Sequence, residues 1–489
     1  MNHNAILFFL GYILRLEAIF LLPSLLIAIF QGEIAAGHAI AITILLSAAL
    51  SLLPLLFKGK ETAITHREGF VIVSLSWIVI SLMGALPFTL SGYIPSYLDA
   101  FFETVSGFTT TGASILTNVE ALPMSLLYWR SFTHWLGGMG ILVFALAIVP
   151  LSKGKGGALH VLRAESPGPS VGKLAPTMRR SARILYAIYI VMTVVEVILL
   201  LLGGMPLFDA VLNSFATAGT GGYAIKNASI AAYNSYYLQT VIAVFMVLFG
   251  INFNLYYLLL IGRVSQALRS EELRVYLGLI AFSTAVIAVN ISGMYTTVRD
   301  AVHHSFFQVA SIITTTGFAT ADFDTWPELS RYILLVLMIA GACAGSTGGG
   351  IKTARVILLW KSLKGTLQKM LHPRSVKVIK MDDKPVEPEV LQGTQTFMVV
   401  YSLVAMASMF LVAIDNFDFE TTFSAVLSCL NNIGPGLSVV GPTGNFSALS
   451  PLSKLVLSAD MLLGRLEIFP MLLLFAPSVW RGRPKFPQK

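Results

Sequence analysis

A short pattern that recurs four times restricts most strongly how this chain of 489 residues can fold. Each copy starts at a phenylalanine and ends, ten or eleven residues later, in a small polar turn closed by glycine; the copies run over 102–112, 208–219, 307–317 and 423–434. The turns read Thr-Thr-Thr-Gly, Ala-Thr-Ala-Gly, Thr-Thr-Thr-Gly and Asn-Asn-Ile-Gly. Four similar turns suggest a ring, and a ring of backbone carbonyls can replace the hydration shell of a cation. The repeat therefore predicts an ion-permeation path.

The composition requires lipid as the solvent of this chain. Hydrophobic residues make up 55% of it, charged residues only 12%, and the mean hydropathy is +0.76. A soluble protein could not bury so much apolar surface. Apolar runs long enough to cross a bilayer as helices predict ten spans, near 5–30, 37–57, 69–91, 125–151, 181–203, 234–262, 274–294, 330–362, 396–414 and 451–480.

Shorter apolar segments precede the polar turns, and they are too short to span a bilayer. They lie near 97–108, 205–215, 300–313 and 419–430. We expect them to form re-entrant half-helices, because irregular backbone at membrane depth is tolerated only where it is buried or lines a cavity.

These elements predict an all-α polytopic membrane protein with four helix–pore-loop–helix repeats after a two-helix hairpin. Each repeat holds two full spans, so all copies enter the membrane from the same side. They are then parallel and surround an axis along the membrane normal, with a central pore. The expected units are the hairpin at 1–68 and the pore repeats at 69–180, 181–273, 274–395 (with a glycine-rich loop) and 396–489.

Charged residues are divided between alternate loops. The basic ones are Lys58, Lys60, Arg67, Lys153, Lys155, Arg163, Lys173, Arg179, Arg180, Arg263, Arg269, Arg274, Lys361, Lys364, Lys369, Arg374, Lys377, Lys380, Arg481, Arg483 and Lys485. The positive-inside rule makes these loops and both termini cytoplasmic. This distribution, with a net charge of +8, argues against nucleic acid as a partner.

The opposite loops are acidic. They carry Asp99, Glu103, Glu120, Asp209, Asp322, Asp324, Glu328, Asp415, Asp418 and Glu420. Carboxylates around an outer mouth would raise the local cation concentration. Any single one of them is more simply a solvated loop charge.

The chemistry of the turns favours a monovalent cation. A half-helix ending at each turn directs the negative end of its dipole toward the axis, and glycine permits backbone dihedrals that present carbonyls inward. No acid lies within the turns, which disfavours divalent ions. The candidate filter residues are Thr110, Thr111, Gly112, Ala218, Gly219, Thr315, Thr316, Gly317, Asn432, Ile433 and Gly434.

A glycine-rich stretch at 341–352 interrupts the eighth predicted span. Its three consecutive glycines, at 348–350, disfavour a helix by about 1 kcal/mol each relative to alanine. Unwound backbone at this depth predicts a mobile barrier in the pore below the turns. The stretch nearly matches a phosphate-binding P-loop, but an extra Ile351 precedes the lysine and no strand precedes the glycines, so nucleotide binding is not expected here.

Arg465 lies in the middle of the last predicted span. A cation at bilayer depth costs at least a few kcal/mol unless it faces a cavity or a partner. It either pairs with a carboxylate such as Asp460 or Glu467, or lies beside the ion path and repels cations until it moves. We assign Arg130, His134 and Trp135, in the fourth span, to packing, and expect no disulfide between Cys343 and Cys429.

The four glycine-closed turns and the glycine-rich stretch together resemble the Trk/Ktr/HKT superfamily of potassium transporters, and most closely its bacterial TrkH/TrkG branch. The similarity covers nearly the whole chain, including the N-terminal helix pair. It implies that the glycine closing each turn determines potassium selectivity. Some sodium-conducting relatives carry serine at the first such position, where this chain has Gly112. The fourth turn departs most from the threonine pattern.

The resemblance also implies an intramembrane gate. Its residues here are Gly345, Ser346, Thr347, Gly348, Gly349, Gly350, Lys352 and Arg465. Potassium is then the transported ion, bound at the filter residues, with no cofactor in this chain and no enzymatic activity.

The expected assembly, by the same resemblance, is a homodimer in the bacterial inner membrane, held against a cytosolic nucleotide-binding regulatory subunit of the TrkA type. The chain has no dinucleotide fingerprint of its own. The alternative is a symporter that couples potassium to sodium or protons. Parallel repeats and turns without acids argue against it, as four filter-like turns argue against a receptor or scaffold.

Overall fold

The computed structural model describes residues 3–56, 66–140, 178–374 and 378–480. Helices form almost all of the regular structure in these ranges, and the expected all-α fold is confirmed. The two strands, β1 (Lys380–Met381) and β2 (Lys384–Pro385), form a minimal antiparallel hairpin. The predicted basic residues at 58–60, 153–173, 377 and 481–485 lie outside the described residues.

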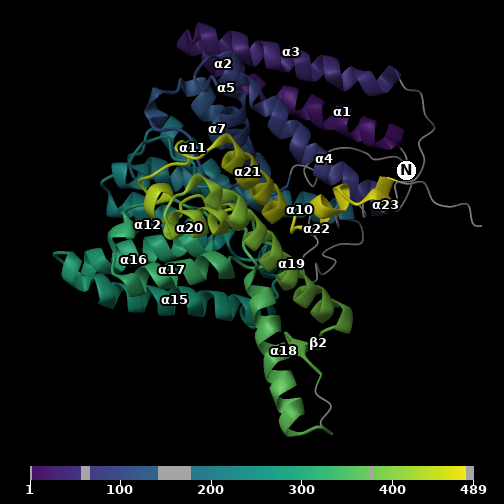
Figure 1. Ribbon diagram of the computed structural model, residues 1–489. Coiled ribbons are helices and arrows are strands. Elements are labelled where there is room, and N and C mark those ends of the chain that lie inside the picture. Colours follow the sequence, from purple (N-terminus) through teal and green to yellow (C-terminus); the bar gives the residue numbers. More distant parts are fainter. Residues whose placement is uncertain (1–2, 57–65, 141–177, 375–377, 481–489) are drawn as a thin grey trace, which may run out of the picture.

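Three helices precede the first repeat, α1 (His3–Phe20), α2 (Leu22–Gln31) and α3 (Ile34–Leu56). Proline in the first turn of α2 separates it from α1, and Gly32, in the left-handed conformation, ends it. Helix α1 packs against α3, and both lie at the edge of the molecule near α4 (Figure 1). The first helix of the expected hairpin is thus divided in two.

The described residues after α3 repeat one order of elements four times: a long helix, a half-helix, a polar turn, a turn of 3₁₀-helix and a second helix. Repeat 1 contains α4 (His66–Gly84), α5 (Leu86–Leu90), α6 (Tyr97–Phe108), η1 (Val119–Ala121) and α7 (Met124–Gly138). Repeat 2 contains α10 (Met178–Leu202), α11 (Leu207–Gly219), η2 (Ser229–Ala232), α12 (Tyr236–Phe249), α13 (Phe253–Leu260) and α14 (Val264–Leu268).

Repeats 3 and 4 follow the same order. Repeat 3 contains α15 (Glu271–Ile291), η3 (Ser292–Met294), α16 (Val298–Ile313), η4 (Phe323–Thr325), α17 (Glu328–Ala340) and α18 (Thr353–Leu371). Repeat 4 contains α19 (Pro388–Val412), η5 (Ala413–Asp415), α20 (Phe419–Leu430), η6 (Ser438–Val440), α21 (Pro451–Arg465), α22 (Phe469–Leu474) and α23 (Pro477–Trp480). Helix α18 projects from the body of the molecule (Figure 1).

The half-helices start where the sequence supplies a cap. The side chains of Ser96, Thr297 and Asp418 each accept a hydrogen bond from the backbone amide three residues on, at the start of α6, α16 and α20. Such a cap contributes about 1 kcal/mol to a helix. Helix α11 follows Pro206 instead, without a side-chain cap.

Six stretches of helix among the described residues are long and apolar enough to cross a membrane, and a seventh is obtained if α12 and α13, which meet at 91°, are counted as one span. The six are His3–Gln31, Ile34–Leu53, Arg67–Leu90, Ala182–Leu202, Glu271–Met294 and Pro388–Asp415. The sequence predicted ten. The difference lies in the second helices of the repeats, which are short or broken: α7, α17 and α21 have 15, 13 and 15 residues.

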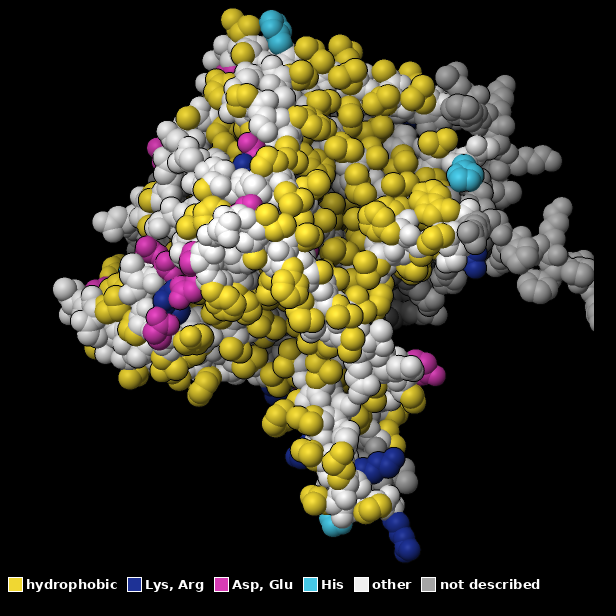
Figure 2. Space-filling model, viewed as in Figure 1, with side chains coloured by type: hydrophobic (Ala, Val, Ile, Leu, Met, Phe, Trp, Pro, Cys, Tyr) yellow, Lys and Arg dark blue, Asp and Glu magenta, His cyan; other side chains and the backbone are white. Residues whose placement is uncertain are grey.

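Apolar side chains cover much of the outer surface (Figure 2). Large ones such as Phe30, Val289 and Phe410 are exposed on α2, α15 and α19. This pattern fits a protein whose outer helices face lipid. Lysine and arginine side chains gather instead along the far part of α18 (Figure 2).

Candidate functional site

The four polar turns share one backbone conformation. Each half-helix is followed by a residue in the left-handed region, and two residues later by a glycine that also has positive φ. The first positions are Thr110, Thr220, Thr315 and Asn432, with φ between 54° and 58°; the glycines are Gly112, Gly222, Gly317 and Gly434. Three of the four first positions hold threonine, whose branched Cβ makes this conformation costly, by about 1–3 kcal/mol.

Identical hydrogen bonds close the four turns. The amide of the middle residue donates to the carbonyl five residues earlier, as from Thr111 to Ser106 at 2.9 Å, and the residue before it donates to the carbonyl three residues earlier, as from Thr110 to Gly107 at 3.1 Å. The same pair recurs at 220–221, 315–316 and 432–433. This is the Schellman ending of a helix, repeated four times.

The second turn lies three residues later than predicted. Ala218 and Gly219 are still in the last turn of α11, where Gly219 packs against the backbone of His134. The residues that match the other three turns are Thr220, Gly221 and Gly222. Helix α11 continues through Ala-Thr-Ala-Gly because nothing in that stretch forces it to stop, whereas Thr220 takes the left-handed conformation.

The turns form a closed ring. A Cβ added at each glycine would lie closer than 3.0 Å to a carbonyl oxygen of the next turn: from Gly112 to Gly221, from Gly222 to Thr316, from Gly317 to Ile433 and from Gly434 back to Thr111. Each turn therefore touches its neighbour through a glycine, with no room for a side chain. Four half-helices end at this ring, so the negative ends of four helix dipoles point to it.

Side chains of the ring bond to protein groups rather than stand free. The Thr111 Oγ1 contacts Thr109 Oγ1 at 2.8 Å and accepts a hydrogen bond from Asn432 Nδ2 at 2.9 Å, which joins the first and fourth turns. Thr316 Oγ1 contacts Thr314 Oγ1 at 2.8 Å. These hydroxyls anchor the turns, and backbone carbonyls are left as the ligands that the ring offers to an ion.

The glycine-rich loop, residues 341–352, joins α17 to α18 beside this ring. The Gly349 amide donates to Thr315 Oγ1 at 2.6 Å, and the Gly350 amide donates to the Asn431 carbonyl at 3.0 Å. These bonds hold the loop directly against the third and fourth turns.

Repeat 2 and helix α15 of repeat 3 hold the same loop from its opposite end. The Cys343 amide donates to the Gly250 carbonyl and the Phe253 amide to the Gly345 carbonyl, each at 3.0 Å, which ties the loop to the bend between α12 and α13. The Glu272 carboxylate, on α15, accepts hydrogen bonds from the Ala344 amide at 2.6 Å and the Ala354 amide at 3.1 Å. Within the loop, the ammonium of Lys352 donates to the Gly348 carbonyl.

Arg465 connects the ring, the loop and the end of α7. Its guanidinium donates to Thr110 Oγ1 at 3.2 Å, to the Thr347 carbonyl at 3.0 Å, and to the carbonyls of Gly137 and Gly138. The C-terminus of a helix is a favourable place for a cation. Of the two carboxylates considered as its partner, Glu467 pairs with Arg355 and Asp460 accepts a hydrogen bond from Ser408 at 2.7 Å.

Comparisons with known proteins identify the family of this chain. The model of the TrkH family, described as cation transport protein, matches residues 36–481. The chain belongs to the TrkH family. The Trk system potassium uptake protein TrkH of Escherichia coli K12 is 38% identical over 468 residues, which cover 94% of this chain and 95% of that protein. TrkG of the same strain is 34% identical, over 87% of this chain and 88% of its own length.

A solved structure of the TrkH family is also similar. The crystal structure of the potassium transporter TrkH from Vibrio parahaemolyticus superposes with a TM-score of 0.87 at 32% identity, covering 98% of this chain and all of that one. Membership in a family of cation transport proteins confirms the prediction of a transporter rather than an enzyme.

One acidic residue of this TrkH-family chain is not where the sequence placed it. Glu103 was expected in an outer acidic loop, but its side chain is fully buried and pairs with Arg130 at 2.7 Å. The Glu103 carboxylate also accepts a hydrogen bond from the Ile115 amide at 2.9 Å. Both cysteines are free, as expected. The described residues contain no group of three or more His, Cys, Asp or Glu side chains suited to a metal ion.

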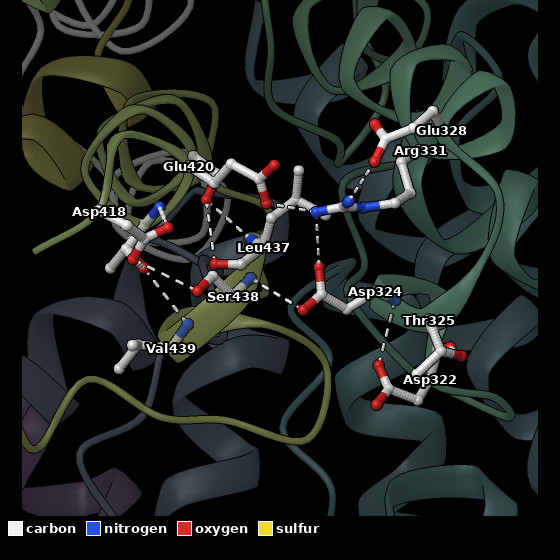
Figure 3. Close-up of polar contacts among 12 residues, drawn as sticks. Asp322, Asp324, Thr325, Glu328, Arg331, Asp418, Glu420, Leu437, Ser438 and Val439 are labelled. Carbon is white, nitrogen blue, oxygen red and sulfur yellow. Dashed lines mark hydrogen bonds and ion pairs between the residues drawn. The ribbon is translucent and has the colours of Figure 1, made fainter.

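Several other predicted outer carboxylates form a cluster that joins repeats 3 and 4 (Figure 3). Arg331, on α17, pairs with Asp324 at 3.2 Å, with Glu328 at 2.9 Å and with Glu420 at the start of α20. Asp324 also accepts a hydrogen bond from the Ser438 amide at 3.1 Å. These acids therefore hold the connecting segments of repeats 3 and 4 together.

Asp418 lies in the same region and caps α20. Burial alone would raise the pKa of its carboxyl, but hydrogen bonds from Thr421 and Ser438 outweigh that effect and hold the pKa below its ordinary value. The charged form is thus the one that caps α20.

Proposed function

We propose that this chain carries potassium into the cell through the ring formed by 110–112, 220–222, 315–317 and 432–434. The observation that supports this best is the closed series of glycine-to-carbonyl contacts, because a filter must offer several neutral oxygens at fixed spacing. The names of the TrkH relatives from Escherichia coli and Vibrio parahaemolyticus support potassium as the ion. Potassium is then substrate, and no cofactor takes part.

In this proposal the second turn contributes Thr220, Gly221 and Gly222 in place of Ala218 and Gly219. The other filter positions are those that the sequence pattern selected. A serine at Gly112 would place a side chain against the Gly221 carbonyl, which gives a physical reason for glycine at that position.

The gate consists of residues 345–350, Lys352 and Arg465. It is supported by the position of the loop against the third and fourth turns and by the guanidinium that joins the ring to the loop. A positive charge beside the ion path repels cations. Conduction then requires the loop and Arg465 to move away from the ring.

The assembly is proposed to be a homodimer in the bacterial inner membrane with both termini in the cytoplasm. A cytosolic nucleotide-binding subunit would act on the gate. Helix α18 supports such a contact, since it continues directly from the loop, projects from the body and carries Lys361, Lys364 and Lys369 (Figure 1).

A symporter that couples potassium to sodium or protons is the alternative. It is less well supported, because the ring contains no carboxylate that would exchange a proton.

The test is flux of rubidium, as a potassium analogue, and of sodium into proteoliposomes. We expect wild-type protein to carry rubidium down its gradient without a counter-gradient of sodium or protons, and Gly112→Ser to lower the preference for potassium over sodium. An unchanged ratio in folded Gly112→Ser would refute the filter assignment. A strict need for a counter-gradient would favour the symporter.

A further inference from the structure

A buried ion pair lies behind the ring in repeat 1. Arg130 Nε donates to Glu103 Oε1 at 2.7 Å, and the two side chains are 3% and 0% exposed. Glu103 comes from the half-helix α6 and Arg130 from the second helix α7. Neither residue contributes to a turn, and the sequence predicted packing for Arg130 and an acidic outer loop for Glu103.

The pair is bound to the segments that leave the first two turns. The Glu103 carboxylate accepts hydrogen bonds from Ser114 Oγ and the Ile115 amide, each at 2.9 Å. Arg130 Nη1 donates to the Ala224 carbonyl at 3.0 Å. Each charged side chain thus forms hydrogen bonds with residues two or three positions past a ring glycine. Glu103 binds the segment after Gly112, and Arg130 binds the segment after Gly222.

Tyr223, the residue after Gly222, is enclosed by this network. The guanidinium of Arg130 lies 3.4 Å from the centre of its ring, and the imidazole of His134 stacks on the ring at 4.1 Å. Its hydroxyl donates to the Glu103 carbonyl at 2.6 Å, and lies 3.4 Å from the Ala113 carbonyl. The tyrosine therefore bridges from the second turn to the first.

His134 completes the support of the second turn. Its Nδ1 accepts a hydrogen bond from the Tyr223 amide at 3.4 Å, which assigns the proton of the neutral ring to Nε2. A Cβ at Gly221 would collide with this imidazole. The histidine is fully buried.

The other three repeats lack these charges at matching positions. Eight residues before the middle of each turn, the half-helices carry Glu103, Asn213, Gln308 and Ala425. Seven residues after the N-cap, the second helices carry Arg130, Ile242, Leu334 and Leu457, and eleven residues after it His134, Met246, Met338 and Met461. All of these side chains are buried. Repeat 1 alone places an acid, a cation and an imidazole where the others have neutral groups.

We propose that Glu103, Arg130, His134 and Tyr223 are positioning residues that fix the spacing between the first and second turns and thereby set ion selectivity. The proposal rests on the proposed function of the ring as a filter. A buried ion pair gives little net stability over well-packed apolar residues, so a purely stabilising role does not explain its presence in one repeat. Rigid, charge-assisted bonds to both segments do explain it, because they oppose the widening or narrowing of one side of the ring.

The decisive variant copies repeat 4 into repeat 1. Glu103→Ala/Arg130→Leu installs the apolar residues that the fold buries at 425 and 457, and removing both charges together leaves neither of them buried without its partner. We expect the double variant to fold and conduct, with a potassium-over-sodium permeability ratio lowered by about fivefold or more, as for a change of roughly 1 kcal/mol between two ions. An unchanged ratio in folded protein overturns the proposal.

Tyr223→Phe is the milder variant and decides the question if the double variant does not fold. It keeps the stacked ring and removes only the hydroxyl bridge to the first turn. A lower ratio with unchanged thermal stability supports positioning, and an unchanged ratio refutes it.

Two parallel variants interpret the result. Glu328→Ala removes a carboxylate, as Glu103→Ala does, but from a side chain that is 68% exposed, and its ratio should stay at the wild-type value. Gly112→Ser tests the ring itself. If it lowers the ratio while the ion-pair variants do not, the filter stands and the positioning proposal fails; if it also leaves the ratio unchanged, the filter assignment has failed.

Discussion

The polar turns of the four repeats are alike, whereas the ends of the second helices differ from one repeat to the next. In the ring, four turns share the same two left-handed positions and the same two hydrogen bonds. At the ends of the second helices no two of the described repeats are alike: α12 bends by 91° into α13, α17 opens into the loop 341–352, and α21 stops before Glu467 and Ile468, which both have positive φ.

The difference indicates that the four repeats must be equivalent in the ring but not at the ends of the second helices. Coordination of one ion by several carbonyls requires equal geometry on all sides. A barrier needs only one element that has two arrangements. The loop of repeat 3 and Arg465 of repeat 4 meet at one side of the ring, so in the proposed gate a single movement would suffice to change the path.

The largest expected effect comes from breaking the equivalence of the ring. Gly222→Ala would place a Cβ against the Thr316 carbonyl, and overpacking of about 1.4 kcal/mol or more would lower potassium flux at least tenfold. The matched control is Gly204→Ala, which has φ of +84° but no atom within 4 Å of the added Cβ. Rubidium uptake measures both, and equal flux from the two variants would show that ring contact does not matter.

The next largest effect concerns the end of α21, where Arg465 contacts the loop 341–352. Arg465→Gln removes a unit charge from the contact between ring and loop, and a barrier lowered by about 1–2 kcal/mol would raise basal flux roughly tenfold. Lys454→Gln is the control, because it removes a cation from the same helix, where it pairs with Asp99. Flux without any activating subunit is measured; a decrease in folded Arg465→Gln would count against the gate.

The hydrogen bond between the third turn and the loop 341–352 should have a smaller effect on flux. Thr315→Val keeps the shape of the side chain but leaves the Gly349 amide without its partner, at a cost of about 1–3 kcal/mol that loosens the loop. Thr220→Val is the matched control, since Thr220 Oγ1 donates only to the neighbouring Gly219 carbonyl. We expect higher basal flux from Thr315→Val than from Thr220→Val. Equal flux from the two variants would show that the bond between the ring and the loop does not control flux.

The smallest effect is a pH dependence at the outer end of α20. The pKa of Asp418 is held low in the folded protein, so its contribution is present above the unfolded pKa, about 4, and is lost as pH falls through the folded pKa. Asp418→Asn keeps a good N-cap without the charge. The midpoint temperature of thermal unfolding, measured in detergent, should therefore decrease less steeply with falling pH in this variant than in the wild type. The same pH dependence in both proteins would argue against a lowered pKa at Asp418.

The sequence located much of this arrangement, for physical reasons that are local. Apolar length, capping residues and glycine-closed turns act within about twelve residues, and they pick out the half-helices and the turns at 112, 317 and 434. The run of glycines likewise marks the loop after α17. In repeat 2 the local signal was ambiguous, because Ala-Thr-Ala-Gly is a good helix end by composition and Thr220-Gly-Gly follows it at once.

Contacts between distant residues were out of reach of that reasoning. Glu103 reads as a loop acid because nothing nearby in the chain reveals Arg130 or Tyr223 as its neighbours. The acceptors of Arg465, the carbonyls at 137, 138 and 347, come from two other repeats. Tertiary packing, not local preference, decides such pairs.

Covalent continuity of the four repeats has a consequence for how such a ring can diversify. In a homotetramer every substitution appears four times around the axis, so a buried acid–base pair or a blocking loop would be copied into all subunits. Here each quarter is encoded separately. One repeat can hold the buried Glu103–Arg130 ion pair behind its turn, another can extend into a loop and a third can supply the guanidinium of Arg465. The glycines that contact the neighbouring turn remain common to all four repeats.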